Sequence, residues 1–169
     1  MNVRDIHTLV DFHYWARDRM LEAVDRLTPE QFTRAMGNSF PSVRDTVVHI
    51  YGAEWIWHLR WRGETPKAMP VPDAFPDVAA VRRAWDEHEQ KMRAFVQDLD
   101  DPRLERVIEY KTMAGQQGAS PLWQMLQHVV NHASYHRGQV TTLLRQLGAA
   151  PPKSTDMITF YRESGGRTN

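Results

Sequence analysis

Two of the eight histidines in this 169-residue chain have a spacing that points to chemistry. His132 and His136 are four residues apart, so on a helix their rings lie on one face, about 40° apart and one turn along the axis. Such a pair can bind one metal ion, with each ring nitrogen about 2.0–2.1 Å from zinc. The alternative is that each ring hydrogen-bonds a backbone carbonyl or a buried carboxylate.

The position of the pair on its helix favours the metal site. Both histidines fall on the apolar seam that includes Val129 and Val140, so we expect them to face the interior. Two unpaired polar rings side by side in a core would cost free energy, of order 1–3 kcal/mol for each group. A metal ion removes this cost because it occupies both lone pairs.

A third histidine, His49, could complete the site from another helix, where it lies at the edge of the apolar arc. One ligand from one helix and an i, i+4 pair from another make a facial triad with open coordination positions. Ala133, and not glutamate, follows His132, so the general base of the zinc metalloprotease motif is missing. We therefore predict a metal site formed by His49, His132 and His136.

The other histidines have less defined roles. His88, on the seam of its own helix, is the main rival as a metal ligand, but we expect it to be a core histidine paired with an acid. His128, one turn before His132, could be a hydrogen-bond donor behind a ligand or a residue of the helix surface. We interpret three further histidines as surface or core residues without a role in the site: His7, His13 and His58.

Two acidic residues flank His49 on the same predicted helix. Asp45 and Glu54 could each orient a ligand ring from behind, although a helix cap explains Asp45 equally well. Arg137 points about 100° away from His136, and we expect it to hold a loop or a partner chain.

The composition excludes several kinds of chemistry. Cysteine is absent, so there is no disulfide, no Cys-ligated zinc and no Cys nucleophile, and any thiol must come from a small molecule. The 21 basic residues equal the 21 acidic ones, which argues against nucleic-acid and membrane partners. No apolar run reaches the length of a membrane span, and the first residues contain no apolar signal core. We therefore expect a cytoplasmic protein.

Apolar residues at three- and four-residue steps predict four long helices that must position these histidines, over residues 2–27, 42–62, 77–99 and 120–148. Thr28 and Pro29 predict a short helix after the first. Four prolines between residues 62 and 77 make that stretch a crossover loop. Residues 104–110 alternate loosely, but the segment is too short to support a predicted sheet.

These patterns predict an all-α fold, an up-down four-helix bundle with a long crossover loop after the second long helix. The chain fits one domain, which we place at residues 1–163. We expect residues 164–169 to form a flexible C-terminal tail.

One stretch around the histidine pair resembles the most specific signature of the DinB/YfiT-like family of damage-inducible four-helix-bundle metalloproteins, with Asn131-His132 followed by His136-Arg137-Gly138-Gln139. Two further features are similar, namely His49-Ile50 followed by Glu54 and Trp57, and a terminal block with Asp156 and Phe160. The resemblance spans nearly the whole chain.

The resemblance implies a divalent-metal site built from His49, His132 and His136, and often a homodimer packed through helices. Characterised relatives include bacillithiol-type thiol-dependent S-transferases and a mycothiol-dependent isomerase. Some relatives replace one histidine by a carboxylate, whereas this chain resembles the version with three histidines.

Three neutral imidazoles leave both charges of a divalent ion uncancelled, so its Lewis acidity stays high. A water at the open position would have a pKa near about 7, and a thiol there would ionise more readily still. Zinc or nickel suits imidazole ligands. We therefore expect a metal-dependent transferase that activates a low-molecular-weight thiol cosubstrate for attack on an electrophilic small-molecule substrate.

Two alternatives remain open on the sequence alone. A metal-dependent hydrolase would use the same triad but would need a general acid or base nearby. A non-catalytic metal-binding stress-response protein would need only the triad and an interaction surface, for which the aromatic run at residues 55–61 is a candidate. The same run is equally consistent with a packed aromatic core that Arg stems help to cover.

Overall fold

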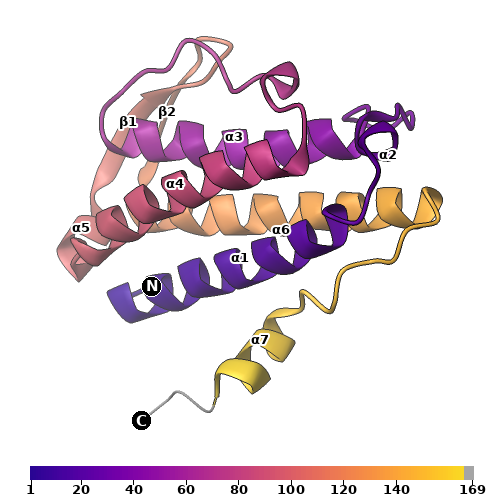
Figure 1. The fold of residues 1–169 in the computed structure, drawn as a ribbon. Coiled ribbons are helices and arrows are strands. Elements are labelled where there is room, and N and C mark those ends of the chain that lie inside the picture. The colour runs from indigo at the N-terminus through magenta and orange to yellow at the C-terminus, as the bar shows by residue number, and fades with distance from the viewer. Residues whose placement is uncertain (166–169) are drawn as a thin grey trace.

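The computed structural model describes residues 1–165, and four long helices form its body (Figure 1). They are α1 (Val3–Val24), α3 (Val43–Trp61), α4 (Val78–Gln97) and α6 (Leu122–Gln146). Five shorter elements join or follow them: α2 (Pro29–Thr33), η1 (Pro72–Ala74), α5 (Asp101–Glu105), β1 (Val107–Lys111) and β2 (Gln117–Pro121). A last helix, α7 (Met157–Ser164), lies outside the body. The predicted all-α four-helix bundle is confirmed.

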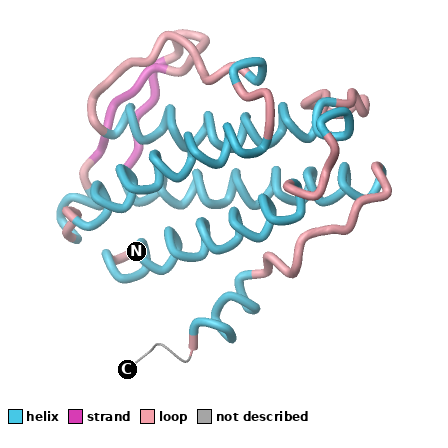
Figure 2. Tube along the Cα trace, viewed as in Figure 1, coloured by secondary structure: helices cyan, strands magenta, loops and turns pink. Residues whose placement is uncertain are grey.

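The four long helices form a closed ring of neighbours. Helix α3 packs on α6, α6 on α1, α1 on α4, and α4 on α3. The long loop after α3, drawn pink in Figure 2, returns the chain to the end of the bundle where α3 began. Helix α4 therefore runs in the same direction as α3, while α6 runs antiparallel to α3 (Figure 1). The predicted crossover is confirmed, and it leaves α3 and α6 free to face each other.

A side-chain cap marks the start of α3, the helix that carries His49. The Ser42 hydroxyl oxygen accepts a hydrogen bond from the Asp45 backbone N–H at 3.1 Å, and the hydroxyl donates to the Asp45 carboxylate. Such a cap satisfies backbone donors that the first turn leaves unpaired. Asp45 is therefore part of the helix cap, the simpler of the two roles considered for it.

A β-hairpin corrects the prediction that the segment after α4 contains no sheet. Strands β1 and β2 pair antiparallel, with Tyr110 opposite Gly118. The Tyr110 ring packs over that glycine, where an added Cβ would lie 2.5 Å from the ring. It also contacts the Trp57 ring of α3 at 4.8 Å. Ser120 and Pro121, which we predicted to open the last long helix, belong to β2 instead.

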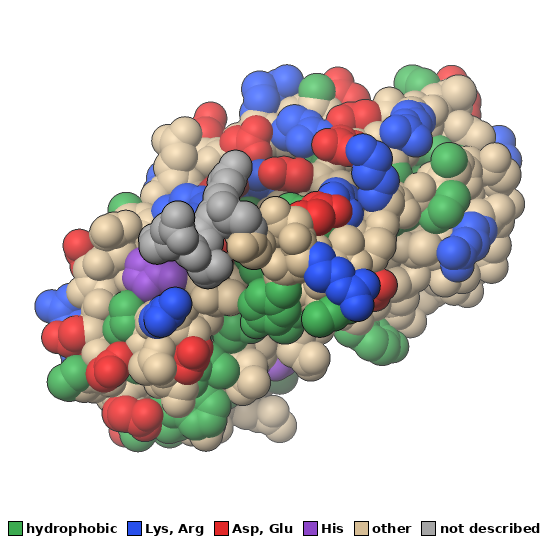
Figure 3. Space-filling model, turned by 90° about the horizontal axis from the view of Figure 1, so that it is seen from below, with side chains coloured by type: hydrophobic (Ala, Val, Ile, Leu, Met, Phe, Trp, Pro, Cys, Tyr) green, Lys and Arg blue, Asp and Glu red, His purple; other side chains and the backbone are tan. Residues whose placement is uncertain are grey.

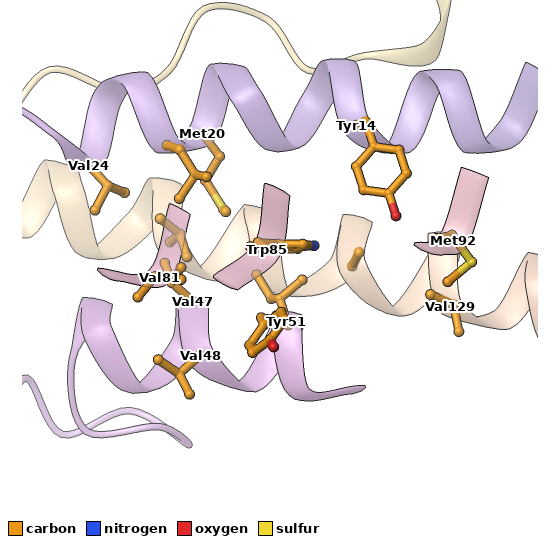
Figure 4. Close-up of a cluster of buried hydrophobic side chains, with 14 of the residues drawn as sticks. Tyr14, Met20, Val24, Val47, Val48, Tyr51, Val81, Trp85, Met92 and Val129 are labelled. Atoms are coloured by element: carbon orange, nitrogen blue, oxygen red, sulfur yellow. The ribbon is translucent and has the colours of Figure 1, made fainter. Parts of the chain in front are cut away.

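The core lies between the four helices and includes buried polar side chains as well as apolar ones. Val24, Met20 and Val47 meet near one end of the bundle, and the fully buried Trp85 lies at its middle (Figure 4). The Tyr14 hydroxyl and the Trp85 indole nitrogen both point into the interior in this view. They mark a buried polar cluster around Glu54, described below.

Helix α7 lies across the outer side of α1. Phe160 packs against Phe12 and Trp15, with ring centroids 5.8 and 5.6 Å apart. Acidic and basic side chains are interspersed on this side of the molecule (Figure 3). Ser164, where we predicted a tail to begin, ends α7, and residues 166–169 lie outside the described residues. Among the described residues, no helix is both long and apolar enough to span a membrane.

Candidate metal centre

The three histidines predicted as ligands converge from two helices. His49 comes from α3, and His132 and His136 come from α6. The Nε2 atom of His132 lies 3.1 Å from Nε2 of His49 and 3.0 Å from Nε2 of His136. One nitrogen from each ring lies within 4.8 Å of the other two. We call these residues the histidine triad.

The spacing of these nitrogens fits one bound cation. Ligands about 2.0–2.1 Å from a tetrahedral zinc ion lie about 3.3 Å from one another. The observed separations of 3.0 and 3.1 Å are close to this value. Without a cation, two nitrogens at this distance need a proton between them, or their lone pairs repel. The three histidines are therefore positioned to bind a metal ion.

The surroundings of His49 and His132 lower the pKa values of both rings, so their nitrogen lone pairs are available to bind a metal ion. Burial, and then the neighbouring His136, lowers the pKa of His49 to about 4. Burial, followed by His136 and His49, lowers the pKa of His132 to about 3. Both rings are thus neutral at pH 7, the state in which imidazole binds metal. His49 and His132 are partly exposed, so the triad can be reached from outside.

Two residues that the sequence did not single out as members of the site hold the triad in place. The Nδ1 atom of His136 donates to Oε1 of Gln139 at 2.6 Å, which leaves Nε2 of that ring free to bind metal. The Phe40 ring stacks on His49, with centroids 4.0 Å apart. Gln139 follows His136 by three residues, a helical spacing that could have revealed it. Phe40 lies in a loop and gave no such signal.

Glu54 corrects one expectation, because its carboxylate does not orient a ligand ring. Its side chain is 1% exposed and lies in the core. It accepts hydrogen bonds from His13 Nε2 at 2.8 Å, Trp85 Nε1 at 2.7 Å and the Tyr14 hydroxyl at 2.5 Å. The prediction was wrong because five residues on a helix turn the side chain about 140° away from His49.

The remaining core histidines surround this carboxylate. His88, expected to be a core histidine beside an acid, has Nε2 3.8 Å from Oε1 of Glu54, as predicted. The His58 ring lies 5.1 Å from the His88 ring. Burial alone would raise the pKa of Glu54, but His13, His88 and the Tyr14 hydroxyl together lower it to about 2. We call Glu54 with His13, His58 and His88 the Glu54 cluster.

Two further residues, His128 and Arg137, lie near the triad but are not part of it. His128 is exposed, and its ring lies 5.8 Å from the His132 ring and 5.4 Å from the Trp57 ring. Its ring thus borders the triad. Arg137 is buried, donates to Ser134 Oγ at 2.7 Å and lies over the Phe12 ring of α1. It therefore joins α6 to α1, whereas we had expected it to hold a loop or a partner chain.

Comparisons with known proteins show the family of this chain. The chain is 23% identical over 164 residues to "Protein DinB" of Bacillus subtilis (strain 168), covering 92% of this chain and 94% of that protein. "Uncharacterized protein YrdA" of the same strain is 32% identical over 84 residues, 49% of this chain and 46% of YrdA.

The fold is similar to a solved structure. A DinB-like protein from Bacillus cereus ATCC 10987 superposes with a TM-score of 0.64 at 18% identity, covering 86% of this chain and 95% of that one. The family model described as "DinB family" matches residues 1–164. This chain therefore belongs to the DinB family.

Proposed function

We propose that this protein is a metal-dependent transferase that activates a low-molecular-weight thiol for attack on an electrophilic small molecule. The observation that carries the proposal is the histidine triad, a ligand set of three imidazoles with no carboxylate among the described residues. A divalent ion held there, zinc or nickel, would keep both charges uncancelled and so favour the ionised form of a bound thiol. The chain has no cysteine, so the thiol is a cosubstrate.

The residues of the chain have defined roles in this proposal. His49, His132 and His136 hold the ion, and Gln139 keeps Nε2 of His136 directed at it. The partly exposed side of the triad leaves room for the thiol and its acceptor. In the transfer, the thiol sulfur forms a bond to the electrophilic carbon. The leaving group departs with its bonding electron pair, and the thiol proton passes to solvent.

The structure gives less support to the two alternatives. A hydrolase needs a group that transfers protons beside the ion. Of the two nearby carboxylates, Glu54 is held in the core and Asp45 is held in the helix cap, which leaves only His128, with its ring 5.8 Å from the His132 ring, as a group for this role. A binding-only protein would need an interaction surface, but much of the aromatic run at residues 55–61 is packed, with His58 and Trp61 both buried. A homodimer and the absence of nucleic-acid and membrane partners stay predictions.

A thiol panel tests the proposal directly. The zinc- or nickel-loaded protein is mixed with low-molecular-weight thiols and 1-chloro-2,4-dinitrobenzene, and formation of the thioether is followed by absorbance. We expect a rate that needs both thiol and metal and that is lost in His132→Ala. The control is His7→Ala, on α1 outside the triad. No thiol-dependent rate would overturn the proposal, and ester hydrolysis without thiol would favour a hydrolase.

A further inference from the structure

A hollow of about 220 Å³ lies next to the metal centre, on the same seam between α3 and α6. Its walls come from α3, from α6 and from the β-hairpin that the sequence did not predict. The residues that line it are Trp57, Tyr110, Ser120, Gln124, Met125 and His128. We call this hollow the Trp57–Tyr110 pocket.

The pocket is close enough to the histidine triad to hold a molecule that reacts there. His128 lines the pocket and lies one turn before His132 on α6, with ring centroids 5.8 Å apart. A cavity of about 150 Å³ is large enough to hold benzene, so this pocket has room for a substituted benzene ring. A reactive carbon on the His128 side of such a ring would lie beside the metal centre.

Three aromatic rings form one corner of the pocket. The Trp57 ring crosses the Tyr110 ring at 70° with centroids 4.8 Å apart, and it crosses the His128 ring at 70° with centroids 5.4 Å apart. A flat ligand can therefore stack on one ring and meet the edge of another, the two arrangements that aromatic pairs prefer. Trp57 and Tyr110 are partly exposed, so such a ligand would also remove apolar surface from water.

The hairpin holds this corner in shape before a ligand binds. The Tyr110 ring lies across Gly118 of the facing strand, where an added Cβ would be 2.5 Å from the ring, so a larger residue there would displace the ring. Met125 is 2% exposed and lines the pocket from the core. A pocket with walls that are already in place binds more tightly, because less conformational freedom is lost on binding.

The lining favours an uncharged ligand. No Asp, Glu, Lys or Arg is among the residues that line the pocket, so a charged group placed there would lose water without gaining a partner of opposite charge. Two neutral polar groups are available instead. Within residues 1–165, the side chains of Ser120 and Gln124 make no hydrogen bond, and both can donate one to a nitro or carbonyl oxygen.

We propose that the Trp57–Tyr110 pocket binds the electrophile of the transfer, and that this electrophile is an uncharged, planar, electron-poor aromatic molecule. An electron-poor ring stacks well on the electron-rich faces of indole and phenol, and its carbons are open to attack by a thiolate. The thiol sulfur bonds to the ring carbon that carries the leaving group, which departs with its bonding electron pair, and the thiol proton passes to solvent. As the electrophile site, this inference rests on the proposed function. As a binding site for uncharged flat rings, it stands on the pocket alone.

The first test compares nitrobenzene with nitrocyclohexane, two uncharged probes of similar size of which only the first is flat and aromatic. Binding to the full-length zinc-loaded protein without thiol is followed by the NMR signal of the Trp57 indole N–H. We expect nitrobenzene to bind about tenfold more tightly, because nitrocyclohexane cannot make the stacking and edge contacts with the two rings. A preference below about threefold, or no binding of nitrobenzene, would overturn the inference.

Variants of Tyr110 assign the preference to its ring. Tyr110→Leu removes the ring and should lower the preference to below about threefold, whereas Tyr110→Phe keeps the ring and should keep the preference. Tyr161→Leu is the matched control, because Tyr161 is exposed on α7 and does not line the pocket. An undiminished preference in Tyr110→Leu would show that the probe binds elsewhere, which also overturns the inference.

A second pair of probes tests the preference for an uncharged ligand. The two molecules 1,3-dinitrobenzene and 3-nitrobenzoate have nearly the same shape, but the second carries a carboxylate in place of a nitro group. In metal-free His132→Ala the carboxylate has no zinc ion to bind, and we expect dinitrobenzene to bind at least about tenfold more tightly. Equal affinities, or tighter binding of 3-nitrobenzoate, would contradict the proposal.

A kinetic comparison separates this inference from the proposed function. The measured quantity is kcat/KM for 1-chloro-2,4-dinitrobenzene divided by kcat/KM for iodoacetamide, a small electrophile without a ring. Tyr110→Leu should lower this ratio by about threefold or more, and Tyr161→Leu should leave it unchanged. A protein that transfers thiol to both electrophiles with an unchanged ratio in Tyr110→Leu has the proposed activity but not the inferred electrophile site. A protein that prefers nitrobenzene as expected and transfers no thiol has the pocket but not the proposed activity.

Discussion

The histidine triad and the Glu54 cluster use the same residue type on neighbouring faces of the same bundle, yet they differ in one respect. The Glu54 cluster contains a buried carboxylate that accepts hydrogen bonds from His13, Tyr14 and Trp85. The triad contains three imidazoles and no acid among the described residues. One cluster therefore has its own counter-charge, and the other needs a cation from outside.

This difference separates a structural cluster from a binding site better than burial or spacing does. His13 and His136 are both buried histidines. The Nε2 atom of His13 hydrogen-bonds the Glu54 carboxylate at 2.8 Å, whereas Nε2 of His136 faces another imidazole nitrogen at 3.0 Å. A buried lone pair that points at another lone pair indicates a missing positive charge.

The largest expected effect comes from removing the carboxylate charge at the centre of the Glu54 cluster. Glu54→Gln keeps the volume but removes the charge that holds three donors, so the free energy of unfolding should fall by about 3–5 kcal/mol. Urea unfolding of the metal-free protein at pH 7 measures this. Glu22→Gln, on the exposed face of α1, is the control and should change it by less than about 0.5 kcal/mol. An equal, small effect in both variants would show that the cluster is not structural.

The triad should respond in the opposite way, with a loss of metal binding and little loss of stability. Loss of a residue that only hydrogen-bonds a ligand lowers metal affinity by up to about 100-fold. His132→Ala removes a ligand itself, the one that contacts both others, so zinc affinity should fall by more than this. Competition with a chromophoric chelator measures this affinity. The metal-free variant should unfold within about 1 kcal/mol of the wild type, because His132 is partly exposed. Unchanged zinc affinity would contradict the triad as the metal site.

The Glu54 cluster also predicts how stability depends on pH. Burial, followed by His88 and Arg62, lowers the pKa of His58 from 6.5 to about 4. Between these values the unfolded chain binds a proton that the folded chain does not, so stability falls as the pH drops from 6.5 to about 4. His58→Phe should reduce this slope by up to about 1.4 kcal/mol per pH unit. Urea unfolding across this window measures the slope, and parallel curves for the two proteins would refute the assignment.

The sequence predicts those features that depend on a single helix. Apolar steps of three and four residues, with a serine cap at Ser42, locate the long helices to within a few residues. The i, i+4 spacing of His132 and His136 places both rings on one face of their helix, whatever other element packs against that face. His49 could be added because it lies at the edge of the apolar arc of another predicted helix.

Features that depend on contacts between elements could not be predicted in the same way. The hairpin exists because Tyr110 packs on both Gly118 and Trp57, and the second of these contacts joins it to a different element. Phe40 reaches His49 from a loop whose path no periodicity describes. Five residues turn the Glu54 side chain about 140° away from His49, but which donors it meets in the core depends on how α1 and α4 pack against α3.

The smallest expected effect lies behind the triad, at Gln139. Its Oε1 accepts a hydrogen bond from His136 Nδ1 at 2.6 Å, so it acts on the metal only through that ring. Loss of such a partner lowers metal affinity by about 10–100-fold, and we expect about tenfold for Gln139→Ala because the ring is also held by packing against Phe40. Gln139→Glu, which restores an acceptor with a charge, should recover the zinc affinity measured by chelator competition. If both variants bind zinc as the wild type does, the ring of His136 is held by packing alone. The triad would then resemble the Glu54 cluster even less, because none of its rings would need a hydrogen-bond acceptor from the chain.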